Sequence, residues 1–195
     1  MSEYTQEMYD WYIKRTNMHI KLVQKWAQVI VDQYWGESTK NIVEEFLNKL
    51  LLNKVKDHDK SKLEDESEIK PYVFISWMYK MKDQGIDYKI PDDVDDTAAT
   101  THHVLSNDHH PEYWSDNFNP INRVDRDKPK ELIDATNMTD TAIVHMCCDW
   151  MAMSEEKGTD PMEWADKNIN VRWKFDEDQV DLIKDILLMY KGEIK

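Results

Sequence analysis

Histidine and aspartate residues in this sequence fall at positions where one metal ion could collect them. His19 has apolar residues three, four and seven positions later, which places it on the apolar face of an expected helix. His58 and Asp59 follow a leucine-rich run, and Asp149 lies in a later apolar segment. A lone inward-facing histidine is ordinarily a hydrogen-bonded core residue, but buried carboxylates and imidazoles together need a partner. A divalent cation is the simplest partner, so we predict one metal site at His19, His58, Asp59 and Asp149.

The sequence gives little support to a glycine-rich nucleotide site or to reactive cysteines. The four glycines are far apart, which excludes the glycine-rich phosphate loops of Walker-type and Rossmann-type nucleotide sites. The only cysteines, Cys147 and Cys148, lie in an apolar stretch typical of inert packing, and their adjacency indicates a reduced chain. His145 lies one turn before Asp149, and is either a further ligand or a histidine at the surface or beside a ligand.

Long helices must position these residues. Glycine and proline number only 4 and 6 in 195 residues, and scarce turn residues favour long helices over many short strands. We predict an all-α fold, a single-domain bundle of five or six helices around the metal site, spanning residues 1–195. The apolar spacing predicts helices over residues 4–34, 42–55, 69–82, 98–105, 139–154 and 180–190, with a charged link at 60–68. The expected caps are Ser38 or Thr39, Asp95 or Asp96, and a capping box at 176–179, while Pro71 is placed in a first helical turn.

The segment 107–130 is polar and contains three prolines, so we predict an irregular loop that forms a pocket wall. Its adjacent His109 and His110 should point in different directions, so that only one need face the metal. Three residues are candidates for substrate binding. Asn107 is one, and Trp114 either stacks on a base or packs at the rim. The third is Arg123, and either Arg123 or Arg126 could clamp a phosphate.

The charge and composition of the chain limit the classes of partner that it is expected to bind. The formal net charge is −14, which disfavours duplex nucleic acid and anionic membrane surfaces as partners. No stretch approaches the roughly 20 apolar residues that span a bilayer, and the N-terminus does not resemble a signal peptide. We therefore expect a cytoplasmic protein that binds a small ligand, in an oligomeric state that the sequence leaves open.

Four ordered runs carry a family resemblance over roughly residues 15–155. They are HDKSK at 58–62, an ExxPY run at 68–72, HxxxNxHHxxxW at 103–114 and CDWMAMS at 148–154. With His19 upstream, this order resembles the HD superfamily of metal-dependent phosphohydrolases. It resembles in particular a small uncharacterised group of phage and bacterial HD-like proteins.

The resemblance implies a metal-dependent phosphohydrolase that acts on a nucleotide or a similar small phosphate ester. His19, His58, Asp59 and Asp149 match the four metal ligands of the family, with Mn, Co, Mg, Zn, Ni or Fe as the ion. Lys62 would stabilise charge on the transferring oxygens, unless it is a solvated surface lysine.

The remaining histidines of the resemblance are assigned a different role. His103, His109 and His110 would orient phosphate or act as the general acid. His103 and His109 are only six residues apart, whereas two-metal HD proteins place their middle histidines on separate helices. Either one or two ions are therefore expected.

Two other functions fit the same residues. One is a non-catalytic protein that sequesters a nucleotide, in the host cytoplasm if a phage encodes it. The other is a di-iron oxygenase on the HD scaffold, because histidine- and aspartate-rich sites suit redox iron.

Overall fold

The structure is a computed structural model that describes residues 2–34, 42–118 and 128–193. The described residues form an all-α fold with two 3-10 turns and two very short strands. The α-helices are α1 (Gln6–Tyr34), α2 (Ile42–Lys54), α3 (Lys60–Glu64), α4 (Glu66–Asp83), α5 (Asp96–Ser106), α7 (Asp140–Lys157), α8 (Pro161–Asn168) and α9 (Glu177–Glu193). The 3-10 turns are η1 (Val55–Asp57) and η2 (Pro111–Trp114), and the strands β1 (Ile133–Asp134) and β2 (Trp173–Lys174) pair in parallel.

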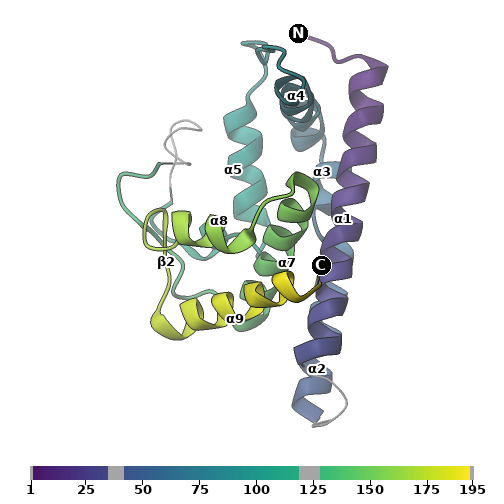
Figure 1. Cartoon of the computed structure of the whole chain (residues 1–195). Coiled ribbons are helices and arrows are strands. Elements are labelled where there is room, and N and C mark those ends of the chain that lie inside the picture. Colours follow the sequence, from purple (N-terminus) through teal and green to yellow (C-terminus); the bar gives the residue numbers. More distant parts are fainter. Residues whose placement is uncertain (1, 35–41, 119–127, 194–195) are drawn as a thin grey trace.

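Helix α1 runs along one side of the molecule, and α4 and α7 pack against it at two different levels (Figure 1). Helices α4 and α5 lie at the upper level, whereas α7, α8 and α9 form the lower one (Figure 1). Helix α7 contacts both α1 and α9, so it is the central helix of the lower level. None of the helices in these ranges is long and apolar enough to cross a membrane.

One stripe of α1 joins two apolar clusters. Near its start, Met8 and Tyr12 pack with residues of α4, whereas farther along Val23 and Trp26 pack into the larger core around α7 and α9. His19 lies on the same stripe between the two clusters and is 5% exposed. Helical spacing therefore places the polar side chain of His19 at the junction of the two apolar clusters.

The helix termini follow the expected caps where the structure describes them. The Asp95 side chain accepts from the Ala98 N–H at 2.8 Å, and the side chain of Thr139 caps α7. Before α9, Asp176 and Gln179 cap each other reciprocally, at 2.8 and 3.0 Å. Local side-chain chemistry thus sets these helix starts. The proposed caps Ser38 and Thr39 lie outside the described residues.

Three expectations about local structure are wrong. The charged link at 60–68 is instead α3 followed by the start of α4, because Asp65 caps a new helix by accepting from the Ser67 N–H at 2.8 Å. Pro71 consequently lies beyond the first turn of α4. The segment 107–130 is not irregular throughout, since Pro111 starts the 3-10 turn η2. Helix α8 and the strand pair had no counterpart in the sequence prediction.

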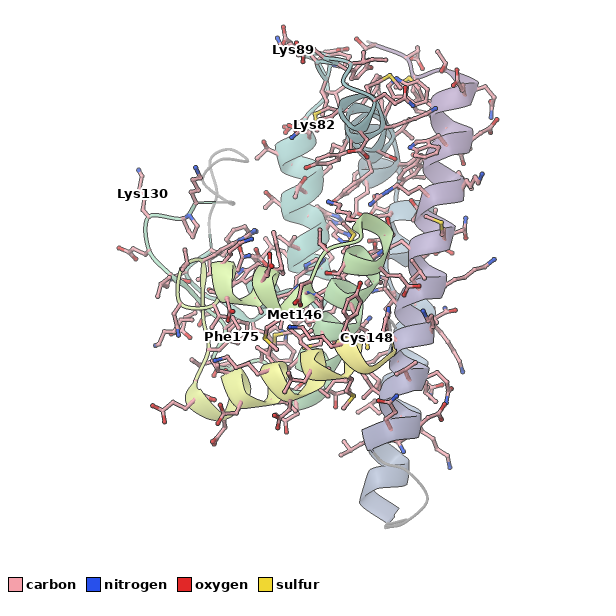
Figure 2. The ribbon with its side chains drawn as sticks, viewed as in Figure 1. Lys82, Lys89, Lys130, Met146, Cys148 and Phe175 are labelled. Carbon is pink, nitrogen blue, oxygen red and sulfur yellow. The ribbon has the colours of Figure 1, made fainter. Side chains whose placement is uncertain are left out.

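Residues of α7 fill much of the lower core. Figure 2 shows Met146, Cys148 and Phe175 among the side chains between the lower helices, whereas Lys89 and Lys130 point outward. Cys147 and Cys148 are fully buried, and burial raises the pKa of both thiols. The expectation of inert, reduced cysteines agrees with this packing.

A buried ion pair ties η2 to β2. Arg172 Nη2 lies 3.0 Å from Glu112 Oε1, and the Trp173 indole N–H donates to the same oxygen at 3.2 Å. Glu112 is fully buried and Arg172 is 5% exposed. Because η2 directly follows His109 and His110, this ion pair anchors the turn that carries them.

Replacing Arg172 should therefore be strongly destabilising. Arg172→Met removes the Arg172 guanidinium from the buried Glu112 carboxylate, which should cost about 3–5 kcal/mol in urea unfolding. Lys174→Met is the matched control, because Lys174 pairs with Asp134 at 3.0 Å on the solvent side of the same strand and should cost less than about 1 kcal/mol. Equal losses in the two variants would contradict an anchoring role for the buried pair.

Candidate metal centre

A tight turn between η1 and α3 presents His58 and Asp59 together. Asp59 has φ 55° and ψ 18°, the left-handed conformation that aspartate tolerates better than most residues. Both side chains are buried, each 2% exposed, although the turn lies between two short helices. Backbone strain of this kind commonly marks a functional site.

The first group of donor atoms forms around the Nε2 atom of His19. It lies 2.9 Å from Asp149 Oδ1 and 3.3 Å from His58 Nε2. His58 Nε2 is in turn 3.6 Å from Asp59 Oδ2 and 4.0 Å from Asp149 Oδ1. The structure therefore brings together the four side chains expected to bind the ion, from α1, the turn and α7.

A second group shares Asp59 with the first. One donor atom from each of Asp59, His103, His109 and His110 lies within 4.8 Å of the others. His103 Nε2 is 3.1 Å from Asp59 Oδ1, and His109 Nε2 is 3.8 Å from the same oxygen. The two groups together contain five histidines and two aspartates, with Asp59 placed to bridge them.

The donor atoms of this second group fit a cation. Four of the buried atoms that lack a hydrogen-bond partner within the described part of the chain belong to this group: Asp59 Oδ1 and the Nε2 atoms of His103, His109 and His110. Buried polar atoms normally have a partner, and four of them converging on one place indicate a bound group. Their lone pairs repel one another unless a positive charge lies between them.

Two glutamates fix the orientation of these lone pairs. His19 Nδ1–H donates to Glu156 Oε1 at 2.6 Å, and His103 Nδ1–H donates to Glu68 Oε2 at 3.1 Å. In the neutral form of each ring, this bond leaves Nε2 as the lone-pair nitrogen that faces the centre, as carboxylates do behind metal-bound histidines. Glu68 is fully buried, and Arg15 pairs with the other oxygen of Glu156 at 3.2 Å.

The sequence prediction did not assign a role to either glutamate. Glu156 lies seven residues after Asp149, two turns along the same helix face, and this spacing was a usable signal. Glu68 is the first residue of the ExxPY run, and that run was interpreted only as one of the four runs of the family resemblance. A search for acidic residues one or two turns from each ligand would have found Glu156.

Burial keeps most of the histidines neutral. It lowers the pKa of His58 to about 4 and that of His145 to about 3. Burial also places the pKa values of His109 and His110 well below 6.5. These imidazoles therefore offer lone pairs at neutral pH, as metal binding requires.

The pKa values of His19, Asp59 and Asp149 depend on the charged groups around them. Burial lowers the pKa of His19, but hydrogen bonds to Asp149 and Glu156 raise it to about 9. Burial raises the pKa of Asp59, yet the positive charge of Lys62 holds it well below its usual value. The pKa of Asp149 is lowered by its hydrogen bond to His19, against the effect of burial.

Lys62 and His145 are both part of the cluster. Lys62 Nζ lies 2.7 Å from Asp59 Oδ2, and its side chain is 21% exposed, so it is not a solvated surface lysine. His145 is 3% exposed, and its Nε2 lies 3.0 Å from His58 Nδ1. The surface alternative for His145 is therefore wrong, and the residue lies beside a candidate ligand.

The expectation that the side chains of His109 and His110 point in different directions is wrong. Both His109 and His110 belong to the Asp59 group. The chain turns here, with the His110 N–H donating to the Asn107 carbonyl at 3.1 Å, so consecutive side chains do not alternate as they would in a strand. Their ring centroids are 4.2 Å apart.

The three candidates for substrate binding have different outcomes. The Asn107 amide donates to the His103 carbonyl at 2.8 Å and to Ser61 Oγ at 3.3 Å, so it holds the end of α5. Trp114 packs against the larger core and donates to the Asp108 carbonyl at 2.8 Å, which agrees with its packing alternative. Arg123 lies outside the described residues.

Fold and site together define an all-α protein with a histidine-rich candidate metal centre. Residues 8–189 match the model of a family described as "Family of unknown function (DUF5662)", and the chain belongs to this family. A search of the curated proteins gave no match, and neither did a search of the solved structures. The resemblance to HD phosphohydrolases therefore stays a prediction that rests on the sequence motifs.

The metal-free protein should lose stability in mild acid. His58, His109 and His145 have folded-state pKa values below the unfolded value of about 6.5, so below that pH the unfolded chain binds protons that the folded chain does not. Between pH 6.5 and 5.0, each should cost roughly 2 kcal/mol in the free energy of unfolding, measured in urea with a chelator present. A free energy of unfolding that stays constant over this range would contradict the burial of these rings.

Glu156→Gln should weaken metal binding. Loss of the carboxylate behind His19 should lower affinity for a divalent ion by about 10–100-fold, measured by competition with a chelator. Glu155→Gln is the matched control, because Glu155 bonds to Lys25 and to the Trp26 indole and does not contact His19. Equal affinities for the two variants would show that Glu156 does not orient a ligand.

Proposed function

We propose that this protein is a metal-dependent phosphohydrolase acting on a nucleotide or a similar small phosphate ester. The observation that carries the proposal is the convergence of two donor groups on the shared carboxylate of Asp59. Divalent ions bound by such groups supply Lewis-acid polarisation of a phosphoryl oxygen and activation of water near neutral pH. The order of motifs that resembles HD phosphohydrolases supports the same class.

The donor set also limits the choice of ion. His19, His58, Asp59 and Asp149 would hold one ion, and Asp59 would share a second with His103, His109 and His110. Imidazole nitrogens outnumber carboxylates here, and such sets suit Zn, Fe, Ni or Cu better than Mg, which prefers oxygen ligands. We therefore propose two transition-metal ions, in place of the single ion that four ligands alone would suggest.

Lys62 supplies the cationic side chain of the proposed reaction. Its ammonium is fixed by Asp59 at 2.7 Å and lies 5.0 Å from the centroid of the Tyr72 ring. Burial lowers the pKa of Lys62, but the charge of Asp59 raises it above its ordinary value, so the side chain stays protonated. A fixed positive charge at this place stabilises the negative charge that develops on phosphoryl oxygens during transfer.

The donor set itself favours a second candidate function, that of a di-iron oxygenase. Imidazole and carboxylate ligands with open positions suit redox iron. Two measurements separate the candidates: a hydrolase releases inorganic phosphate from a nucleotide panel without dioxygen, whereas an oxygenase consumes dioxygen and needs iron.

Asp59→Ala should remove metal and turnover together. The bridging carboxylate serves both groups, so metal content should fall to less than half and phosphate release by at least about 10³-fold. Glu64→Ala is the control. Glu64 is the last residue of α3, the short helix that Asp59 precedes, and its side chain is 65% exposed and pairs only weakly with Lys60. Full metal content with full turnover in Asp59→Ala would refute the proposed centre.

Lys62→Met separates charge stabilisation from metal binding. The variant should keep its metal and lose turnover by roughly 10²–10³-fold, as removal of one stabilising group does in other enzymes. Metal content is read by elemental analysis and turnover by phosphate release. Unchanged turnover with bound metal would assign Lys62 a structural role only.

A further inference from the structure

A polar cavity of about 330 Å³ opens beside the metal centre, where the ends of α2 and α5 approach α7. Three histidines that line it are buried: His58, His109 and His145. Charged side chains from the end of α2 and from the neighbouring turns also line it, namely Lys54, Asp57 and Asp108. The proposed function assigns no role to this cavity.

His58 forms the wall between the cavity and the centre. Its Nε2 faces His19 at 3.3 Å, whereas its Nδ1 faces His145 at 3.0 Å. The three histidine rings lie close together, with centroids 4.4, 4.7 and 5.1 Å apart. One donor atom from each lies within 4.8 Å of the others, which is the spacing of a three-histidine cation site.

His145 adds an unsatisfied polar atom to this group. Its Nδ1 is buried and has no hydrogen-bond partner within the described ranges. A buried ring nitrogen without a partner is costly, so its presence next to a cavity points to a ligand. Neutral imidazoles do not attract an anion, whereas they are common ligands of divalent transition-metal ions.

We propose that His58, His109 and His145 form an uptake site, at which a divalent cation binds on its way to the metal centre. The inference rests on the proposed function, because it assumes that the centre binds metal. A neutral His58 offers a lone pair at only one ring nitrogen at a time. Binding at its Nδ1 and at its Nε2 are therefore alternatives, which makes the uptake site a transient one.

The charges around the cavity suit a cation. Asp57 has a 74% exposed side chain, and Asp108 pairs with Lys54 across the opening. The carboxylates raise the local concentration of cations, and Lys54 opposes them. The chain as a whole carries −14, which acts in the same direction as the carboxylates.

The test follows Co²⁺ uptake by the metal-free protein, with visible absorbance giving the rate and elemental analysis the final content. His145→Gln should slow uptake by at least about tenfold and leave the final content unchanged. The Gln carbonyl can still accept from His58 Nδ1, so this variant removes a ligand but keeps the neighbour that orients His58. Glu155→Gln is the control, because Glu155 bonds to Lys25 and to the Trp26 indole and does not line the cavity, and it should match the wild type.

Variants that change the charge beside the cavity give a second test, because they should change the rate of Co²⁺ uptake in opposite directions. Asp57→Asn should slow Co²⁺ uptake and Lys54→Met should accelerate it, each by a few-fold and less so at high salt. An unchanged rate in His145→Gln, or a loss of final Co²⁺ content, would overturn the uptake site while leaving the centre intact. Failure of the wild type to bind Co²⁺ at equilibrium would instead overturn the metal centre and the uptake site together.

Discussion

The carboxylate of Asp59 is an anion held in the interior, and the surrounding elements are arranged around its charge. A buried anion is stable only with positive charge or several donors next to it. Lys62 provides one cation at 2.7 Å, but the same cluster also contains Asp149, Glu68 and Glu156. Burial lowers the pKa values of His58, His109 and His110, so these neighbouring rings are neutral and do not balance the charge. We propose that bound cations balance this arrangement, which otherwise brings many electron-pair donors close together.

Residues from distant parts of the chain form and support the candidate metal centre. Helix α1 carries His19 to the junction of two apolar clusters, and α7 brings Asp149 and Glu156 on one face. The turn with His109 and His110 is held from behind by the buried pair of Glu112 and Arg172, which reaches into the C-terminal region. The centre is therefore a property of the entire fold.

Much of this arrangement could be predicted from single residues and their spacing. His19 and Asp149 occupied apolar faces, and the caps at Asp95 and Asp176 marked helix starts, because both signals are local. The second donor group was harder. A turn rather than a strand decides where His109 and His110 point, and nothing in their spacing reveals that turn. The pairing of Glu112 with Arg172, sixty residues apart, likewise depends on packing that no local pattern records.

Metal analysis combined with anomalous X-ray diffraction from crystals of the purified protein tests the central claim most directly. The account predicts about two transition-metal ions per chain. One should lie among His19, His58, Asp59 and Asp149, and the other among Asp59, His103, His109 and His110. A protein that binds no divalent ion at micromolar concentration, or that binds it away from Asp59, would contradict the account.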